Sequence, residues 1–265
     1  MTGLLASWWG RIRIEVLLAL RDRRTMAFTV ILPLVLLVAL ASLIHGTPLP
    51  DGVSYAQYLT AGMIASGLVY GGFQGLAIAI PEERSDGTLK RLYGTPMRHS
   101  AYFAGKVGAV VVIYVIQMVL LLGTGALAFH VKLPTSATAI VTFIWLSALA
   151  LLTFTTLGIA FSSLAKTGQS AAALASPIVL FLQFTSGVFF VFTQEPRWMQ
   201  VFASFFPLRW LCQGMRSVFL PASYGAQEVG GSFHLGQCAL VLGIWAVIGL
   251  VLCKRTFRWL PLGED

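Results

Sequence analysis

Charged side chains are scarce in this chain, which has 265 residues of which 11% are Asp, Glu, Lys or Arg. A soluble domain would carry roughly a quarter. In contrast, 57% of the residues are hydrophobic, and the mean hydropathy is +0.81. This composition excludes an ordinary soluble protein and indicates a membrane protein. The net charge of +8 is then typical of loops beside anionic lipid headgroups, and we expect no binding to nucleic acid.

Cysteines are few, and the motifs of common catalytic sites are missing. Cys212, Cys238 and Cys253 have neither a metal-binding spacing nor the pattern of a disulfide framework. A pairing of Cys212 with Cys238 is conceivable, but we favour free thiols. The chain has no GxxxxGK[ST] motif for ATP phosphates, and its four histidines show no HExxH or Cys/His spacing. The sequence therefore predicts no catalytic residue, no metal site and no cofactor bound by this chain.

Ionisable side chains are also missing from the middle of the long apolar stretches. Ion-coupled secondary transporters usually have such groups at the membrane midplane, so this class is disfavoured. A passive channel is disfavoured because no stretch has a polar face suited to a water-filled pore.

Six apolar stretches are each long enough to cross a membrane once as a helix. We therefore predict an all-α membrane protein with spans at about 26–44, 58–80, 103–129, 137–164, 169–192 and 235–253. These spans form a single transmembrane domain over residues 26–265. Ala39 and Ala41 would also fit a cleaved signal peptide, but the preceding segment is too long and amphipathic for one, which favours retention of the first span.

The segment 1–25 contains five arginines and an apolar stripe, and we predict that it is an amphipathic helix in the cytoplasmic membrane interface. Arg11, Glu15 and Asp22 fall on the side opposite the stripe. The stripe consists of Leu5, Trp9, Ile12, Val16 and Leu20.

The segment 193–221 is apolar but is interrupted by prolines and arginines. It is too broken to span a membrane and too apolar for a free loop, so we predict a re-entrant pair of short helices at the outer face. The alternative is a seventh span, which would move the basic tail outside.

Most Lys and Arg residues precede the first span, follow the second, or follow the last. This distribution predicts that both termini are cytoplasmic.

Two sets of residues in the spans are candidates for packing or for cargo contact. Gly67, Gly71 and Gly75 form a small-xxx-small ladder, which fits either packing within the chain or a dimer seam. Polar and aromatic side chains of the second and fifth spans could line a substrate cavity, although packing between helices is the interpretation we favour. These side chains are Tyr70, Phe73, Gln74, Phe181 and Phe184.

The most charged stretch of the chain is PEERSDGTLKRLYGTP, residues 81–96, between the second and third spans. Such a segment cannot lie in hydrocarbon, so we predict that it projects into water. Gly87 lies in its middle, and Pro81 and Pro96 bracket it, which predicts a bent, short helix.

The stretch EERSDGTLKRLYGTP resembles the cytoplasmic loop of ABC-2 type transporter permeases, in particular the daunorubicin-resistance-like drug exporters. The stretch SGVFFVFTQEPRWMQVFASFFPLRWLCQGMRSVFL, from Ser186 to Leu220, is similar to their outer re-entrant region. The resemblance covers nearly the whole chain and implies a type V exporter-like fold. It implies outward transport of a hydrophobic or amphipathic compound, drug-like or lipid-like, across the cell (inner or plasma) membrane, and a role in efflux or drug resistance.

The resemblance also implies partners and a coupling site. Two copies of a separate ATPase subunit would hold ATP and Mg, and a second permease copy, identical or different, would complete the complex. The coupling contact with the ATPase would involve Glu82, Glu83, Arg84, Gly87, Thr88, Leu89, Arg91 and Pro96. A permease for a lipid-linked glycan or polysaccharide remains an alternative. An intramembrane enzyme or a structural membrane protein without an ATPase is the alternative from another class.

Overall fold

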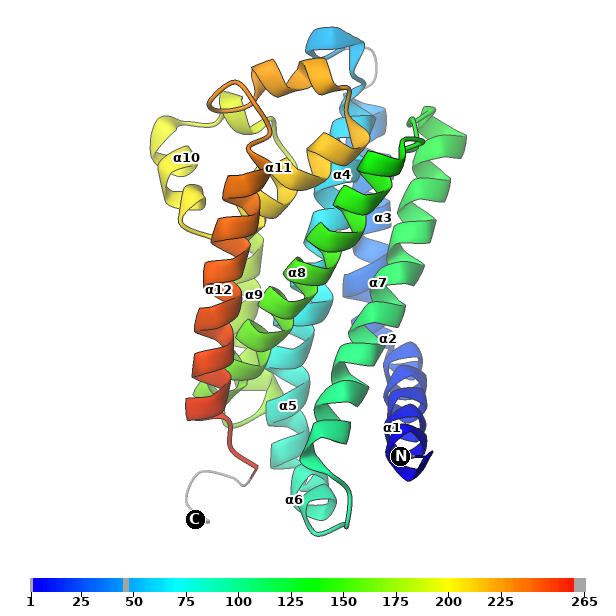
Figure 1. Ribbon diagram of the computed structural model, residues 1–265, viewed down its shortest axis with the longest axis vertical. Helices are drawn as coiled ribbons and strands as arrows, with labels where there is room; N and C mark the ends of the chain where they lie inside the picture. Colours follow the sequence, from blue (N-terminus) through cyan, green and yellow to red (C-terminus); the bar gives the residue numbers. More distant parts are fainter. Residues whose placement is uncertain (1, 45–47, 260–265) are drawn as a thin grey trace.

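The chain folds as an all-helical membrane protein, seen in a computed structural model that describes residues 2–44 and 48–259 (Figure 1). The described residues do not include Met1, residues 45–47 or residues 260–265. These positions fall within or between the predicted segments. Five of the described helices are long and apolar enough to cross a membrane, and a shorter apolar helix, Ala27–Leu43, occurs at the predicted first span. The five are Tyr55–Ser85, His99–Phe129, Ala137–Leu164, Gly168–Thr185 and Leu235–Thr256.

The helix at the centre of the bundle is α4 (Tyr55–Leu68), in which every residue is buried. It packs against α3 (Leu32–Leu43), α7 (His99–Phe129), α8 (Ala137–Phe161) and α11 (Pro207–Phe219). Its start is capped by Ser54, whose side chain accepts a hydrogen bond from the Gln57 amide. A helix that is apolar on all sides must be surrounded by other helices or lipid, and here other helices surround it.

Two spans contain π-helical turns, η1 (Ala27–Ile31) and η3 (Val69–Gly75). In η3, Gly72 lies directly against Gly158 of α8, and a Cβ on Gly158 would overlap the Gly72 and Phe73 carbonyl oxygens. The absence of side chains at this crossing lets the two backbones touch. After η3 the helix continues as α5 (Leu76–Ser85), which runs through Pro81. The helix of the second span therefore ends at Ser85, beyond the predicted end at residue 80.

One end of the bundle is closed by short helices (Figure 1, top). Helix α9 (Gly168–Thr185) ends seven residues before the predicted limit of the fifth span at Phe192. The chain then forms η5 (Phe192–Gln194), α10 (Arg197–Ser204) and α11, followed by η6 (Ala222–Gln227), which contacts η2 (Pro50–Gly52). Helix α11 is almost entirely buried and packs on α4, α8 and α12 (Leu235–Thr256). Two short helices thus occur where the broken apolar segment 193–221 predicts them.

The opposite end carries α1 (Thr2–Arg21), α2 (Arg23–Met26), α6 (Thr88–Tyr93) and the residues after α12 (Figure 1, bottom). Helix α1 lies along α7. Trp259, near the described C-terminal limit, packs on Tyr93 and His99, with ring centroids 5.9 and 4.5 Å away. Helix α1 and the residues after α12 therefore lie at the same end of the bundle as the charged segment 81–96 (Figure 1).

Candidate functional site

The charged segment begins as a direct extension of the central span. Helix α5 carries Glu82, Glu83 and Arg84 on its last turn, and Gly87 then turns the chain with a φ of +78° into α6. An L-residue with a side chain is strained at this φ, so glycine is required for the bend. The Asp86 carboxylate accepts a hydrogen bond of 2.8 Å from the Thr88 amide and thereby satisfies the first amide of α6.

The bend is anchored inward by two buried side chains. Leu89 of α6 is fully buried. Arg84 is 5% exposed, and its Nη1 donates to the Ser162 carbonyl oxygen, 3.1 Å away, at the end of α8. Its Nε donates over 3.3 Å to the carbonyl oxygen of Arg258, beyond α12. A single arginine therefore ties the end of α5 to two other elements through backbone acceptors.

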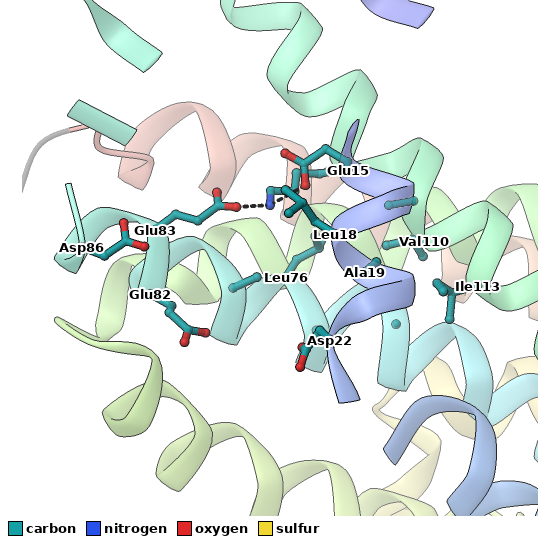
Figure 2. Close-up of a pocket in the computed structure, with 15 residues that line it drawn as sticks. Glu15, Leu18, Ala19, Asp22, Leu76, Glu82, Glu83, Asp86, Val110 and Ile113 are labelled. Carbon is teal, nitrogen blue, oxygen red and sulfur yellow. Dashed lines mark hydrogen bonds and ion pairs between the residues drawn. The ribbon is translucent and has the colours of Figure 1, made fainter. Parts of the chain in front are cut away.

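A buried ion-pair network joins α5 to α7 and α1 (Figure 2). Lys106 of α7 is 5% exposed, and its Nζ donates to the Glu15 carboxylate of α1 at 2.8 Å and to the Glu83 carboxylate of α5. Arg11 also pairs with Glu15, and the Tyr102 hydroxyl donates to Glu83 at 2.7 Å. A buried charge is tolerated only with such partners, so each member depends on the others.

Small residues on α7 allow α1 to approach this network closely. A Cβ on Gly105 would lie 2.8 Å from Arg11 Cγ and 2.9 Å from Glu15 Cγ. A Cβ on Gly108 would lie 2.8 Å from Ile12 Cγ2. Either substitution would push α1 away from α7 and lengthen the ion pairs.

Helix α1 turns a mixed face of polar and apolar side chains toward α7. Arg11, Ile12 and Glu15 face α7, whereas Trp9 is 72% exposed. Lipid can cover exposed apolar side chains such as Trp9, whereas the Glu15 carboxylate takes its ionic partner Lys106 from α7. The side chain of Leu5, the first member of the predicted stripe, lies outside the described side chains.

A cavity of about 270 Å³ lies between α1, η3, α5 and α7, beside the network. Glu15, Glu83 and Lys106 form part of its wall, and Glu82 and Asp86 lie at the α5 end (Figure 2). Asp22, directly after α1, approaches from the other side. The rest of the lining is apolar and includes Gly71, Gly75, Leu76, Val110 and Ile113.

The predicted coupling residues divide into an inward and an outward group. Glu83, Arg84 and Leu89 are engaged with the bundle, as described above. Glu82, Arg91 and Pro96 are exposed, and Gly87 and Thr88 are half-buried at the turn. The Arg91 guanidinium donates to the Thr88 hydroxyl at 3.2 Å. The exposed group forms the part of the segment that a second protein can reach.

The predicted cavity residues are held in contacts between helices, and none of the five lines the cavity described above. The Gln74 amide donates to the Ser176 hydroxyl of α9 at 2.9 Å, a hydrogen bond between two helices. The Phe73 ring packs edge-on against Phe161, and Tyr70 is buried. Phe181 and Phe184 are 43% and 41% exposed on α9, where they contact Phe202 and Phe189.

The glycine ladder of the second span faces other parts of the same chain. Gly67 lies against the Gln117 side chain of α7, and Gly71 lies near Val110 and Thr29. Gly75 borders the cavity. Packing within the chain therefore uses at least Gly67 and Gly71.

A second buried ionic cluster lies at the opposite end of the bundle. Arg216 of α11 is fully buried, and its Nε and Nη2 pair with both oxygens of the Glu228 carboxylate. Its guanidinium lies 4.9 Å from the centre of the Tyr58 ring of α4. Arg209 lies over the rings of Trp210 and Phe192, at 4.1 and 4.8 Å. Burial, together with the smaller effect of the neighbouring Arg216 charge, lowers the pKa of Arg209 to about 10.

The described residues contain neither a disulfide nor a cluster of metal ligands. Cys212, Cys238 and Cys253 are free thiols, as favoured from their spacing. Within residues 2–44 and 48–259, no group of three or more His, Cys, Asp or Glu side chains could hold a metal ion.

Sequence reasoning missed the network because its members come from three separate segments. A signal was present in the pattern Gly105-Lys106-Val107-Gly108, where two glycines flank a lysine near a span entrance. Glycines at this spacing indicate a close helix neighbour, and a lysine between them needs an acidic partner on that neighbour. Glu15 is an acid on an otherwise basic and apolar helix, and it is that partner.

These features define a multi-pass membrane protein in which a charged extension of the central span is tied to the surrounding helices. The family model described as ABC-2 type transporter matches residues 7–220, which is more than half of the chain. The chain belongs to this family of transporter membrane subunits. A comparison with curated proteins finds no match. Permeases of this family are transport subunits without an ATPase domain, and they pair with ATP-binding subunits.

Proposed function

We propose that this chain is the permease of an ATP-driven exporter that moves a hydrophobic or amphipathic compound outward across the cell membrane. Two copies of a separate ATPase subunit would supply the work, and a second permease copy would complete the pathway. Both termini would be cytoplasmic, as the distribution of Lys and Arg indicates. The observation that carries the proposal is the unbroken helix that links the buried centre of the bundle to the exposed bend at Gly87.

In this proposal the exposed side of α6 is the docking surface for the ATPase. Arg91, Glu82 and Thr88 offer charges and hydrogen-bond groups to a soluble partner, and Pro96 completes the surface at the entry to α7. A displacement of α6 would move Leu89 and Arg84 together, and Arg84 contacts the ends of α8 and α12. Glu83 would transmit the same displacement to α7 and α1 through Lys106.

The neutral middle of the bundle supports a hydrophobic or amphipathic cargo. Hydrogen bonds between neutral groups join the helices there, as between Gln74 and Ser176 and between Tyr114 and Ser147. Phe181 and Phe184 present apolar surface on α9. Together with Tyr70 and Phe73 they remain our candidates for contact with cargo in the complete complex.

The experiment reverses one exposed charge on α6 with the variant Arg91→Glu. The matched control is Arg197→Glu, which changes an exposed arginine on α10, at the other end of the bundle. The tagged chain is purified in mild detergent with its ATPase, and recovery of the ATPase and substrate-stimulated ATP hydrolysis are measured. We expect Arg91→Glu to lower both severalfold while the control behaves like the wild type. Normal ATPase recovery and stimulation in Arg91→Glu would refute the docking assignment.

A further inference from the structure

The floor of the cavity beside α1 is open because two helix positions carry no side chain. A Cβ on Gly75 would meet only the Tyr70 carbonyl oxygen of its own helix, at 3.2 Å, and otherwise open space. A Cβ on Gly71 would make only ordinary contacts with Val110 and Thr29. Leu18 of α1 and Leu76 of α5 add apolar wall. The cavity is therefore a preformed apolar recess rather than a gap between polar surfaces.

The charge around this recess is strongly negative, although the chain as a whole carries +8. Five of the ten acidic residues line it, namely Glu15, Asp22, Glu82, Glu83 and Asp86. Lys106 is the one basic residue in the lining, and it is held by Glu15 and Glu83 on one wall. Glu82 and Asp86 thus leave an excess of negative charge at the α5 end of the recess (Figure 2).

We propose that this recess binds a hydrophobic organic cation, such as an alkyl- or aryl-ammonium compound. The apolar floor would take the hydrocarbon part, and the carboxylates of Glu82 and Asp86 would face the ammonium group. A metal ion does not fit, because these carboxylates are not grouped as ligands in the described part of the chain. The negative charge of the recess repels an anionic ligand, and a fully polar ligand gains no apolar contact with the floor.

The position of the recess gives it a role in transport, and this role rests on the proposed function. The recess adjoins α5 directly before the bend to α6, and α1 covers it on one side with an exposed apolar face toward lipid. A cation that partitions into the cytoplasmic headgroup region would reach it beside α1. Cargo would then bind in the recess, at a place where a movement of α5 changes the shape of the recess. Binding itself requires neither ATPase nor transport.

The test measures binding to the purified chain without ATPase, in nanodiscs of zwitterionic lipid. Equilibrium dialysis with radiolabelled octyltrimethylammonium is compared with octanesulfonate, which has the same chain length and the opposite charge, and empty nanodiscs supply the background. We expect saturable binding of the cation and no saturable binding of the anion. Because each exposed charge pair contributes at most about 1 kcal/mol, the double variant Glu82→Gln/Asp86→Asn is expected to weaken binding roughly fivefold.

Two further variants distinguish binding of the cation in the recess from binding to surface charge elsewhere on the protein. Gly75→Leu fills the floor and is expected to abolish saturable binding, whereas Asp51→Asn removes an acid at the far end and is expected to bind like the wild type. The isosteric double variant keeps the test valid if Gly75→Leu does not fold. Equal saturable binding of cation and anion, or wild-type affinity in the double variant, would overturn the proposal.

Failure of this proposal and failure of the proposed function give different results. If the chain binds the cation but no ATPase co-purifies with it, the proposal for the recess stands and the exporter assignment fails. If the chain co-purifies with an ATPase whose ATP hydrolysis responds to α6 substitutions, but the chain binds no cation, the exporter assignment stands. The proposal for the recess then fails.

Discussion

Replacement of Lys106 by methionine tests the ion-pair network most directly. The substitution keeps an unbranched side chain of similar length and removes the charge that lies between Glu15 and Glu83. Loss of one partner from a fully buried pair costs about 3–5 kcal/mol of unfolding free energy. Here Glu15 retains Arg11 and Glu83 retains the Tyr102 hydroxyl, so we expect the lower value of about 2–3 kcal/mol.

The network explanation also makes a prediction about rescue. The triple variant Lys106→Met/Glu15→Gln/Glu83→Gln removes the buried carboxylates together with the lysine. Neutral replacement of a complete buried ion group is often close to neutral, so the triple variant is expected to lie within about 1 kcal/mol of the wild type. Lys166→Met, at an exposed position in the loop before α9, is the control for loss of a lysine.

The assay is unfolding of the purified chain in mild detergent, by SDS titration and by heating. A loss of 2–3 kcal/mol corresponds to a fall of about 5–10 °C in Tm for a domain of this size. The reasoning is refuted if Lys106→Met unfolds like the Lys166→Met control, or if the triple variant is no more stable than the single one. Either result would mean that the lysine is solvated and that the ion pairs contribute little to stability.

Two further predictions concern other parts of the bundle. Burial raises the pKa of Glu195, before α10, from 4.5 to about 7, against the lowering effects of the Gly187 amide and the Arg216 charge. The folded state therefore holds this proton more tightly than the unfolded state, so stability is fully present below about pH 4.5 and falls as the pH rises through 7. We expect the Tm of the wild type to fall between pH 5 and pH 8 and that of Glu195→Gln to fall less, and equal falls would contradict the assignment. At the crossing of η3 and α8, Gly158→Ala should cost roughly 2–4 kcal/mol, because the new methyl group meets two backbone carbonyls. Gly243→Ala, where nothing lies within 4 Å, should be neutral or stabilising in the same unfolding assay, and similar losses in both would exclude close packing as the cause.

The sequence predicts the spans well because membrane insertion depends mainly on the length and polarity of each segment. The uncharged stretch Met26–Ile44 contains the apolar helix Ala27–Leu43, and the broken segment 193–221 contains two short helices. Gly87 is also predicted at a bend, since few other residues adopt a positive φ. These features follow from local chemistry, and no knowledge of neighbouring helices is needed.

Helix boundaries at prolines could not be predicted in the same way. Proline lacks the amide that continues a helix, so Pro81 suggests a helix end. The structure instead continues α5 through Pro81 to Ser85, where Arg84 is bonded to the ends of two other helices. Tertiary contacts after the proline stabilise the final turn, and those contacts come from residues more than 70 positions later in the chain.

The orientation of α1 shows the main limit of pattern reasoning in a membrane. An amphipathic pattern identifies the apolar face of a helix but not the medium that covers it. In water that face would turn toward the protein, whereas beside a bilayer lipid covers it equally well. The choice is then made by Glu15, whose carboxylate pairs with Arg11 on α1 itself and with Lys106 on α7. The site could be predicted only once α1 and α7 were known to be neighbours.

The distribution of bonds along the bundle indicates where a transport movement can occur. Both ends contain buried ion pairs, around Lys106 and around Arg216, and breaking either would remove an ionic partner from a buried charge. The middle is joined by neutral hydrogen bonds such as Gln74–Ser176, whose net contribution is about 1 kcal/mol each. The backbones of η3 and α8 also touch there at Gly72 and Gly158, without side chains that interlock. We therefore expect each end to move as a rigid unit, with η3 as the pivot, when α6 is displaced.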